Sequence, residues 1–101
     1  MAQMLTLAAL AANPDCLHMI DVRDAEDFSS AHVTGAVHIP HIPLAELEDC
    51  TGEMPVGKTP VTICGKGGGR SAEGADILKK LGHPDALWLE GGTKGWLARN
   101  T

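Results

Sequence analysis

VTICGKGGGRSAEGADILKKL, residues 61–81, joins a short apolar segment to a helical one through a run of glycines. Val61–Cys64 is rich in β-branched side chains, which is typical of a strand. Over Ala72–Leu81 the apolar residues recur at spacings near one helical turn, so a helix is expected, and Gly82 follows where a helix C-cap belongs. The stretch therefore predicts a strand, a glycine loop and a helix in that order.

The rest of the chain repeats this alternation of short apolar strands with helices. Strands of a parallel sheet are apolar almost throughout, because helical crossovers cover both of its sides. We therefore predict an α/β fold with an open parallel sheet, helices on both faces, and a single domain over residues 1–101. The further strands are expected at Leu17–Val22, Ala36–Ile39 and Ala86–Leu89, and the further helices at Thr6–Ala12, Asp24–Ser30, Leu44–Asp49 and Thr93–Arg99. The opening segment is interpreted as a first helix over the sheet.

The carboxyl ends of parallel strands lie along one edge of the sheet, and ligands bind in crevices there. The glycine loop follows such an end, so it is predicted to belong to a binding site. The residues expected along this edge are Asp21–Arg23, Pro40–Ile42, Cys64–Arg70 and Glu90–Thr93.

The composition limits the partners and the compartment that we expect. The formal net charge is −5 and aromatic residues make up 3% of the chain, which argues against a basic or stacking surface for nucleic acid. No apolar run approaches the roughly 18 residues that span a bilayer, and the Lys/Arg-rich start of a secretory signal is missing. Three cysteines without a CxxC pair favour reduced thiols over a disulfide framework or a four-cysteine zinc site, so a cytoplasmic protein is expected.

The segment after the strand at Val61–Cys64 is the candidate catalytic site. Its glycines can take positive φ and turn backbone N–H groups inward, which forms a nest for anions. The helix that begins near Ser71 points its own N–H groups and positive end into the same space. These groups favour a thiolate, so Cys64 is predicted to be an activated sulfur nucleophile. The predicted substrate-binding residues are Gly65, Lys66, Gly67, Gly68, Gly69, Arg70 and Ser71.

Two other interpretations of this loop are less favoured. A lone cysteine at a strand end is commonly a small buried hydrophobe, but here it is followed by a glycine cradle. A nucleotide phosphate loop has the order Gly-x-x-x-x-Gly-Lys-Ser/Thr, whereas Lys66 comes early and Arg70 directly precedes Ser71.

Four motifs follow one another along the chain: MIDVRDAEDF at 19–28, AHVTGAVHIP at 31–40, the Cys64 loop with Arg70 and Ser71, and LEGGTKGW at 89–96. In this order and spacing they resemble the single-domain rhodanese family, which are thiosulfate-type sulfurtransferases. The resemblance covers nearly the whole chain and implies that Cys64 carries a persulfide between donor and acceptor. It also implies structural or supporting roles for Asp21, Arg23, His32, Gly91, Gly92 and Trp96.

The loop departs from the usual sulfurtransferase pattern in its length. Five residues separate Cys64 from Arg70, where the usual loop has four. Cys-x5-Arg resembles instead the rhodanese-fold cell-cycle phosphatases and eukaryotic-type arsenate reductases. Those relatives typically have His before the cysteine, where this chain has Ile63, and the intervening loop offers no carboxylate as a general acid. Sulfur transfer is favoured, with phosphatase or arsenate reductase activity as one alternative and a non-catalytic binding module as another.

The predicted reaction consists of two half-reactions on one cysteine. Cys64 attacks the outer sulfur of thiosulfate, or of a persulfide or polysulfide donor, and a thiol, protein thiol or cyanide then removes the sulfur. Lys66 is expected to hold the sulfonate of the donor and Arg70 the departing sulfite, because a guanidinium matches an oxyanion with two hydrogen bonds. No metal or organic cofactor is needed. Simpler roles stay open for both, Lys66 as a solvated lysine and Arg70 as a helix-start residue paired with Glu73 or Asp76.

The remaining histidines and cysteines are predicted to be structural. His38 and His41 form an HxxH pair without further donors near them in the sequence, so packing is favoured over a metal site. Cys16 and Cys50 lack any signal that places them beside Cys64 as a resolving thiol.

Overall fold

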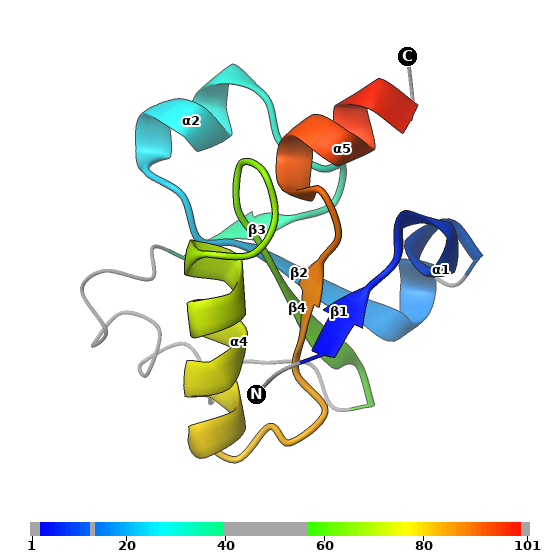
Figure 1. The fold of residues 1–101 in the computed structure, drawn as a ribbon, viewed down its shortest axis with the longest axis vertical. Helices are drawn as coiled ribbons and strands as arrows, with labels where there is room; N and C mark the ends of the chain where they lie inside the picture. Colours follow the sequence, from blue (N-terminus) through cyan, green and yellow to red (C-terminus); the bar gives the residue numbers. More distant parts are fainter. Residues whose placement is uncertain (1–2, 13, 40–56, 100–101) are drawn as a thin grey trace.

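A five-stranded sheet forms the centre of the computed structural model, which describes residues 3–12, 14–39 and 57–99 (Figure 1). The strand order is β1-β5-β4-β2-β3, and all neighbouring strands are parallel. In chain order the elements are β1 (Gln3–Leu5), α1 (Leu7–Ala12), a 3₁₀ helix (Pro14–Cys16), β2 (Leu17–Asp21), α2 (Ala25–Ser30), β3 (Val37–His38), β4 (Thr59–Ile63), α4 (Arg70–Lys80), β5 (Leu87–Leu89) and α5 (Gly92–Arg99).

Two apolar clusters cover the two faces of this sheet, which confirms the predicted helices on both sides. The cluster on one face joins Leu78 of α4 to Ile20 of β2. The cluster on the other face joins Leu10 of α1 and side chains of α2 and α5 to Ile63 of β4. Burial on both faces explains why the central strands are apolar at almost every position. No helix in the described part of the chain is long and apolar enough to cross a membrane.

The predicted strands and helices within the described ranges agree with the observed ones to within two residues at each end. α4 also ends as expected, since the His83 N–H donates to Leu78 O at 2.9 Å and the Gly82 N–H to Lys79 O at 3.4 Å. The helix predicted at Leu44–Asp49 and the edge segment Pro40–Ile42 lie outside the described residues.

The interpretation of the opening segment as a helix alone was wrong. Gln3–Leu5 is a strand that pairs in parallel with β5, with Met4 opposite Trp88. The Glu90 N–H donates to Leu5 O at 2.9 Å and continues this pairing beyond the strand. Three residues are too few to show the alternation of a strand, so pairing with β5 rather than local pattern determines this element.

Candidate active site

The loop between β4 and α4 stands at the carboxyl end of the sheet, between α2 and α5 (Figure 1). It forms one wall of a pocket of about 520 Å³. Arg23, the loop that begins at Cys64, and Thr93 all line this pocket, so segments predicted at the sheet edge do meet in space. The parallel register of β2, β4 and β5 places these strand ends side by side.

Cys64 is 7% exposed and lies in the wall of the pocket. Its Sγ donates hydrogen bonds to Gly68 O and to Ser71 Oγ, both at 3.2 Å. Ser71 is fully buried, and its Oγ donates to Gly68 O at 2.9 Å. The contacts of the sulfur are therefore acceptors, whereas the sequence predicted a ring of N–H groups. A neutral thiol carries a proton and donates it, so its hydrogen-bond partners are acceptors rather than N–H groups.

Two strands hold the ends of the loop in place. Thr62 of β4 donates through Oγ1 to Ser71 O at 2.5 Å and to Leu87 O at 3.3 Å, which ties the first turn of α4 to the sheet. On the other side, the Thr93 N–H donates to Cys64 O at 2.8 Å and the Lys94 N–H to Gly65 O at 3.0 Å. The N-terminus of α5 thus caps the backbone carbonyls of the loop.

Gly92 allows α5 to come this close. A Cβ at this position would collide with Cys64 O and lie 2.7 Å from Gly67 N. Its φ of 59° also lies in the left-handed region that favours glycine. A Cβ on Gly67 would in turn lie 2.7 Å from Gly91 N. These contacts give Gly91 and Gly92 the structural place that the resemblance implied.

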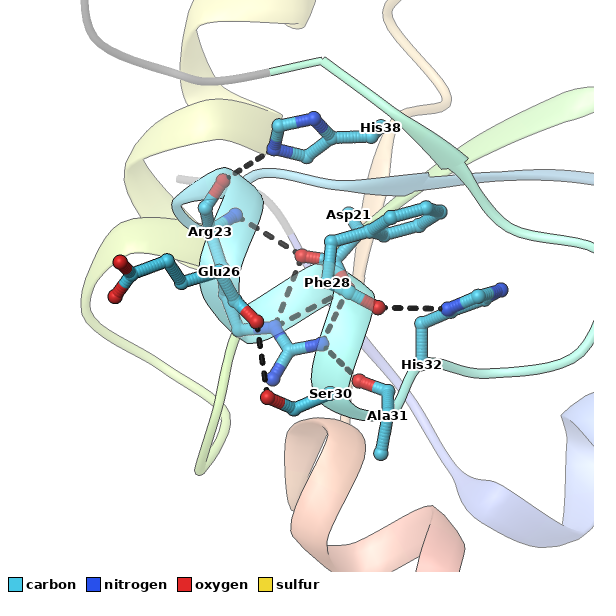
Figure 2. A network of polar contacts seen from close by, with 8 residues as sticks. All are labelled: Asp21, Arg23, Glu26, Phe28, Ser30, Ala31, His32 and His38. Carbon is cyan, nitrogen blue, oxygen red and sulfur yellow. Dashed lines mark hydrogen bonds and ion pairs between the residues drawn. The ribbon is translucent and has the colours of Figure 1, made fainter.

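Asp21 and Arg23 form a polar network at the pocket, whose wall Arg23 lines (Figure 2). Asp21 is fully buried and accepts from Arg23 Nε at 3.0 and 3.1 Å, from Nη2 at 2.8 Å and from the Arg23 N–H at 3.0 Å. Arg23 Nη2 also donates to Ala31 O at 2.6 Å, which fastens the end of α2. The hydrogen bonds to Asp21 raise the pKa of Arg23 above its ordinary value against the opposing effect of burial, and the charges of Asp21 and Asp27 act in the same direction. Arg23 is thus a cation held in place by Asp21 and by the carbonyl of Ala31.

His32 and His38 pack against the ring of Phe28 (Figure 2). His32 also contacts Phe28 O through Nδ1 at 2.8 Å, and His38 contacts Arg23 O through Nε2 at 2.6 Å. His41 lies outside the described residues, as does Cys50. Cys16 is exposed. Among residues 3–12, 14–39 and 57–99, no three His, Cys, Asp or Glu side chains gather as metal ligands.

Charged side chains of both signs surround the pocket. Lys66 and Arg70 line it, and Arg70 forms an ion pair with Asp24, directly before α2, at 3.8 Å, with both side chains exposed. Sequence reasoning missed two further charges, Lys94 of α5 and Asp27 of α2. Both lie within the quoted motifs, but nothing in the sequence places α2 opposite the glycine loop. The pocket therefore has a carboxylate, although the loop itself has none.

Thr93 is a further residue of the pocket, and its hydroxyl has an unusual environment. The residue is 2% exposed, and Oγ1 has no hydrogen-bond partner among the described residues. The sequence placed this position at the sheet edge and at the start of the last predicted helix.

Nearly the whole chain matches the model of a known protein family. The model of the Rhodanese-like domain matches residues 5–99. The chain belongs to the rhodanese-like domain family. Its members of similar sequence include the probable adenylyltransferase/sulfurtransferase MoeZ of Mycobacterium tuberculosis, 39% identical over 79% of this chain and 20% of MoeZ. They also include the thiosulfate sulfurtransferase GlpE of Tolumonas auensis, 34% identical over 77% of this chain and 70% of GlpE.

Solved structures confirm the rhodanese-like fold. The human single-domain sulfurtransferase TSTD1 superposes with a TM-score of 0.82 over the full length of both chains at 21% identity. At that identity the likeness concerns the fold alone. This rhodanese-like chain spans a fifth of the length of MoeZ and most of the length of GlpE and TSTD1.

Proposed function

We propose that this rhodanese-like protein is a sulfurtransferase that uses Cys64 as its nucleophile. The observation that carries the proposal is the position of Cys64, in a pocket whose walls hold Arg23, Lys66, Arg70 and Lys94. Four cations around the sulfur attract a small anionic donor. The names of similar proteins, thiosulfate sulfurtransferase GlpE among them, point to the same class of reaction.

The proposed reaction passes one sulfur atom through a persulfide. The Cys64 thiolate attacks the outer sulfur of thiosulfate, the S–S bond of thiosulfate breaks, and its electron pair leaves with sulfite. A persulfide or polysulfide donor reacts in the same way. The thiolate of a small molecule or protein, or cyanide, then attacks the outer sulfur of the persulfide and returns Cys64 as thiolate. We propose cytoplasmic thiols as acceptors and no nucleic acid or membrane partner, since the chain carries a formal charge of −5.

The loop is proposed to bind the donor, and the Asp21–Arg23 network to hold a cation beside it. Arg70 and Lys66 bind the oxyanion part of the donor, Gly65, Gly67, Gly68 and Gly69 give it room, and Ser71 orients the sulfur through the contact at 3.2 Å. Asp21 holds Arg23 as a fixed cation in the pocket wall.

Mass spectrometry of the intact protein tests this function. After incubation with thiosulfate and removal of the excess, wild type should gain one sulfur atom and release it as thiocyanate when cyanide is added. Cys64→Ser should gain none, whereas Cys16→Ser and Cys50→Ser should behave as wild type. A wild type that gains no sulfur, or a Cys64→Ser protein that still does, contradicts the proposal.

A second candidate function, hydrolysis of a phosphate ester or reduction of arsenate, is favoured by the carboxylate of Asp27 in the pocket wall. A carboxylic acid there could protonate a leaving alkoxide, which the loop alone cannot do. Hydrolysis of para-nitrophenyl phosphate, measured beside sulfur transfer, discriminates the two. Hydrolysis that is fast in wild type and at least about tenfold slower in Asp27→Asn would favour the phosphatase. If the protein shows neither activity, the alternative of a non-catalytic binding module is favoured.

A further inference from the structure

The hydroxyl of Thr93 is a buried polar group without a partner in the described part of the chain. Thr93 is 2% exposed, and its Oγ1 makes no hydrogen bond to any described residue. The large majority of buried polar side-chain atoms are hydrogen-bonded, because an unpaired one has lost its water and costs free energy. An unpaired hydroxyl in the wall of a pocket therefore points to a partner that arrives with the ligand.

Thr93 and Cys64 together form the buried part of the pocket wall. Of the described residues that line the pocket, these two are buried and the others are half-buried or exposed. The Thr93 N–H donates to Cys64 O at 2.8 Å, so the two residues are in direct contact. Gly92 permits this approach, since a Cβ there would collide with Cys64 O. Thr93 is thus fixed beside the residue that the proposed function makes reactive.

The side chain of Thr93 is the part of this residue that can take up a ligand. Thr93 is the second residue of α5 (Gly92–Arg99), whose N-terminal end carries a partial positive charge and favours an anion. The N–H groups of Thr93 and Lys94 already donate to the carbonyls of Cys64 and Gly65. The hydroxyl is the remaining donor of Thr93.

Burial also indicates which atom of a sulfur donor comes close to Thr93. Lys66 and Arg70, which are proposed to bind the oxyanion of the donor, are both exposed. The oxyanion leaves as sulfite, whereas the transferred sulfur stays bonded to Cys64 in the buried part of the wall. The transferred sulfur carries negative charge in the persulfide anion, and hydrogen bonds to charged acceptors are stronger than those to neutral ones.

We propose that Thr93 binds the transferred sulfur, with Oγ1 donating a hydrogen bond to the outer sulfur of the Cys64 persulfide. The bond forms when Cys64 Sγ joins the outer sulfur of thiosulfate, the S–S bond of thiosulfate breaks and its electron pair leaves with sulfite. It is lost when a thiolate or cyanide attacks that sulfur and Cys64 leaves as thiolate. The proposal deepens the proposed function and rests on it, since it names a residue that binds the intermediate.

Thr93→Val tests whether the hydroxyl has a partner inside the protein. Valine is also β-branched and close to threonine in size, but it lacks the hydroxyl. Removing an unpaired buried hydroxyl should not destabilise the fold, so the urea midpoint of Thr93→Val should equal or exceed that of wild type. A midpoint clearly below that of wild type would show that the protein itself holds the hydroxyl, and it would overturn the proposal.

The equilibrium of sulfur loading measures the hydrogen bond to the transferred sulfur. In a mixture of thiosulfate and sulfite, the intact mass gives the fraction of protein that carries one added sulfur. The free and loaded forms both lack the sulfonate, so contacts to the oxyanion do not enter this equilibrium constant. In a Cys16→Ser, Cys50→Ser background, Thr93→Val should lower the constant by at least about fivefold, which corresponds to the loss of one hydrogen bond.

Thr93→Ser is the matched control, because it retains the hydroxyl and should keep the constant within about twofold of the parent. Equal constants for Thr93→Val and the parent, or an equal loss in Thr93→Ser, would overturn the role of Thr93 while sulfur transfer by Cys64 stands. A parent that gains no sulfur would contradict the proposed function and this inference with it. The two proposals can therefore be told apart by which protein fails to load.

Discussion

Asp21 is a fully buried carboxylate, and its charge is matched by the Arg23 guanidinium at 2.8 Å. Replacing it with Asn leaves a mostly buried cation without its counter-charge, and breaking a buried pair in this way costs about 3 kcal/mol. We therefore predict that Asp21→Asn lowers the free energy of unfolding by about that amount, measured with urea. Asp24→Asn removes an exposed carboxylate 3.8 Å from Arg70 and should stay within about 0.5 kcal/mol of wild type. Similar losses in the two variants would contradict the assigned role of Asp21.

Asp27 places a negative charge in the wall of a pocket that is proposed to take an anion. Removing this charge should ease the entry of thiosulfate, so Asp27→Asn is predicted to raise kcat/KM by about twofold at low ionic strength. The gain should shrink as salt is added, since Asp27 is exposed and salt screens exposed charges.

Glu26→Gln is the matched control for Asp27→Asn. Glu26 is also exposed on α2 but does not line the pocket. If both variants raise kcat/KM equally, net charge rather than the position of Asp27 is responsible.

At the scale of the element, α5 matters for the site because its first turn lies against the loop. Gly92→Ala would place a methyl group on Cys64 O and so push the helix away from the carbonyls that Thr93 and Lys94 bind. We predict that sulfur loading of Cys64 slows by about tenfold or more, because a displacement of the order of 1 Å at a reacting group has that cost. The rate is measured in a single turnover with thiosulfate.

Gly95→Ala is the control for this prediction. Its Cβ would lie 3.4 Å from Glu90 O, which is an ordinary contact, and alanine is a better helix former than glycine. Sulfur loading should therefore stay close to wild type. A Gly92→Ala protein that loads sulfur as fast as Gly95→Ala would show that the position of α5 does not govern the site.

The elements also show what the sequence alone can predict. The strand at Val61–Cys64 and the helix α4 could be predicted because their patterns are local. The loop between them could be predicted because a run of glycines between a strand and a helix is typical of a loop. β1 was not predicted because it is three residues long and depends on pairing with β5. The place of Asp27 in the pocket was not predicted for a related reason, since it depends on the packing of α2 beside the loop. The orientation of the Gly68 carbonyl depends on a single peptide dihedral, which no sequence pattern encodes.

For the whole molecule, His18 should contribute to the pH dependence of stability. Burial, and then the charge of Lys58, lower the pKa of His18 below its ordinary value of 6.5. The unfolded chain therefore binds a proton at a higher pH than the folded one. This contribution to stability is complete above about pH 6.5 and is lost as the pH falls from there toward the folded pKa. We predict that wild type loses more free energy of unfolding between pH 7.5 and 5.5 than His18→Gln does.

Urea unfolding at several pH values in this range measures the difference. The difference in unfolding free energy should be below about 1 kcal/mol, because His18 is only half-buried and solvent screens its charge. An identical pH dependence in wild type and His18→Gln would exclude His18 as a source.

The two tryptophans report on the two faces of the sheet and so test whether residues 1–101 unfold as the single domain that we propose. Trp88 packs with the cluster under α4, and Trp96 packs with the cluster on the opposite face. Trp96→Phe leaves Trp88 as the fluorophore, and Trp88→Phe leaves Trp96, since the chain has two tryptophans. Because β2 gives Ile20 to one cluster and Leu17 and Met19 to the other, neither face can lose its packing without exposing the other. In each variant, fluorescence and circular dichroism should therefore follow one transition with the same urea midpoint. A fluorescence midpoint that departs from the circular dichroism midpoint in either variant would mean that the faces unfold separately.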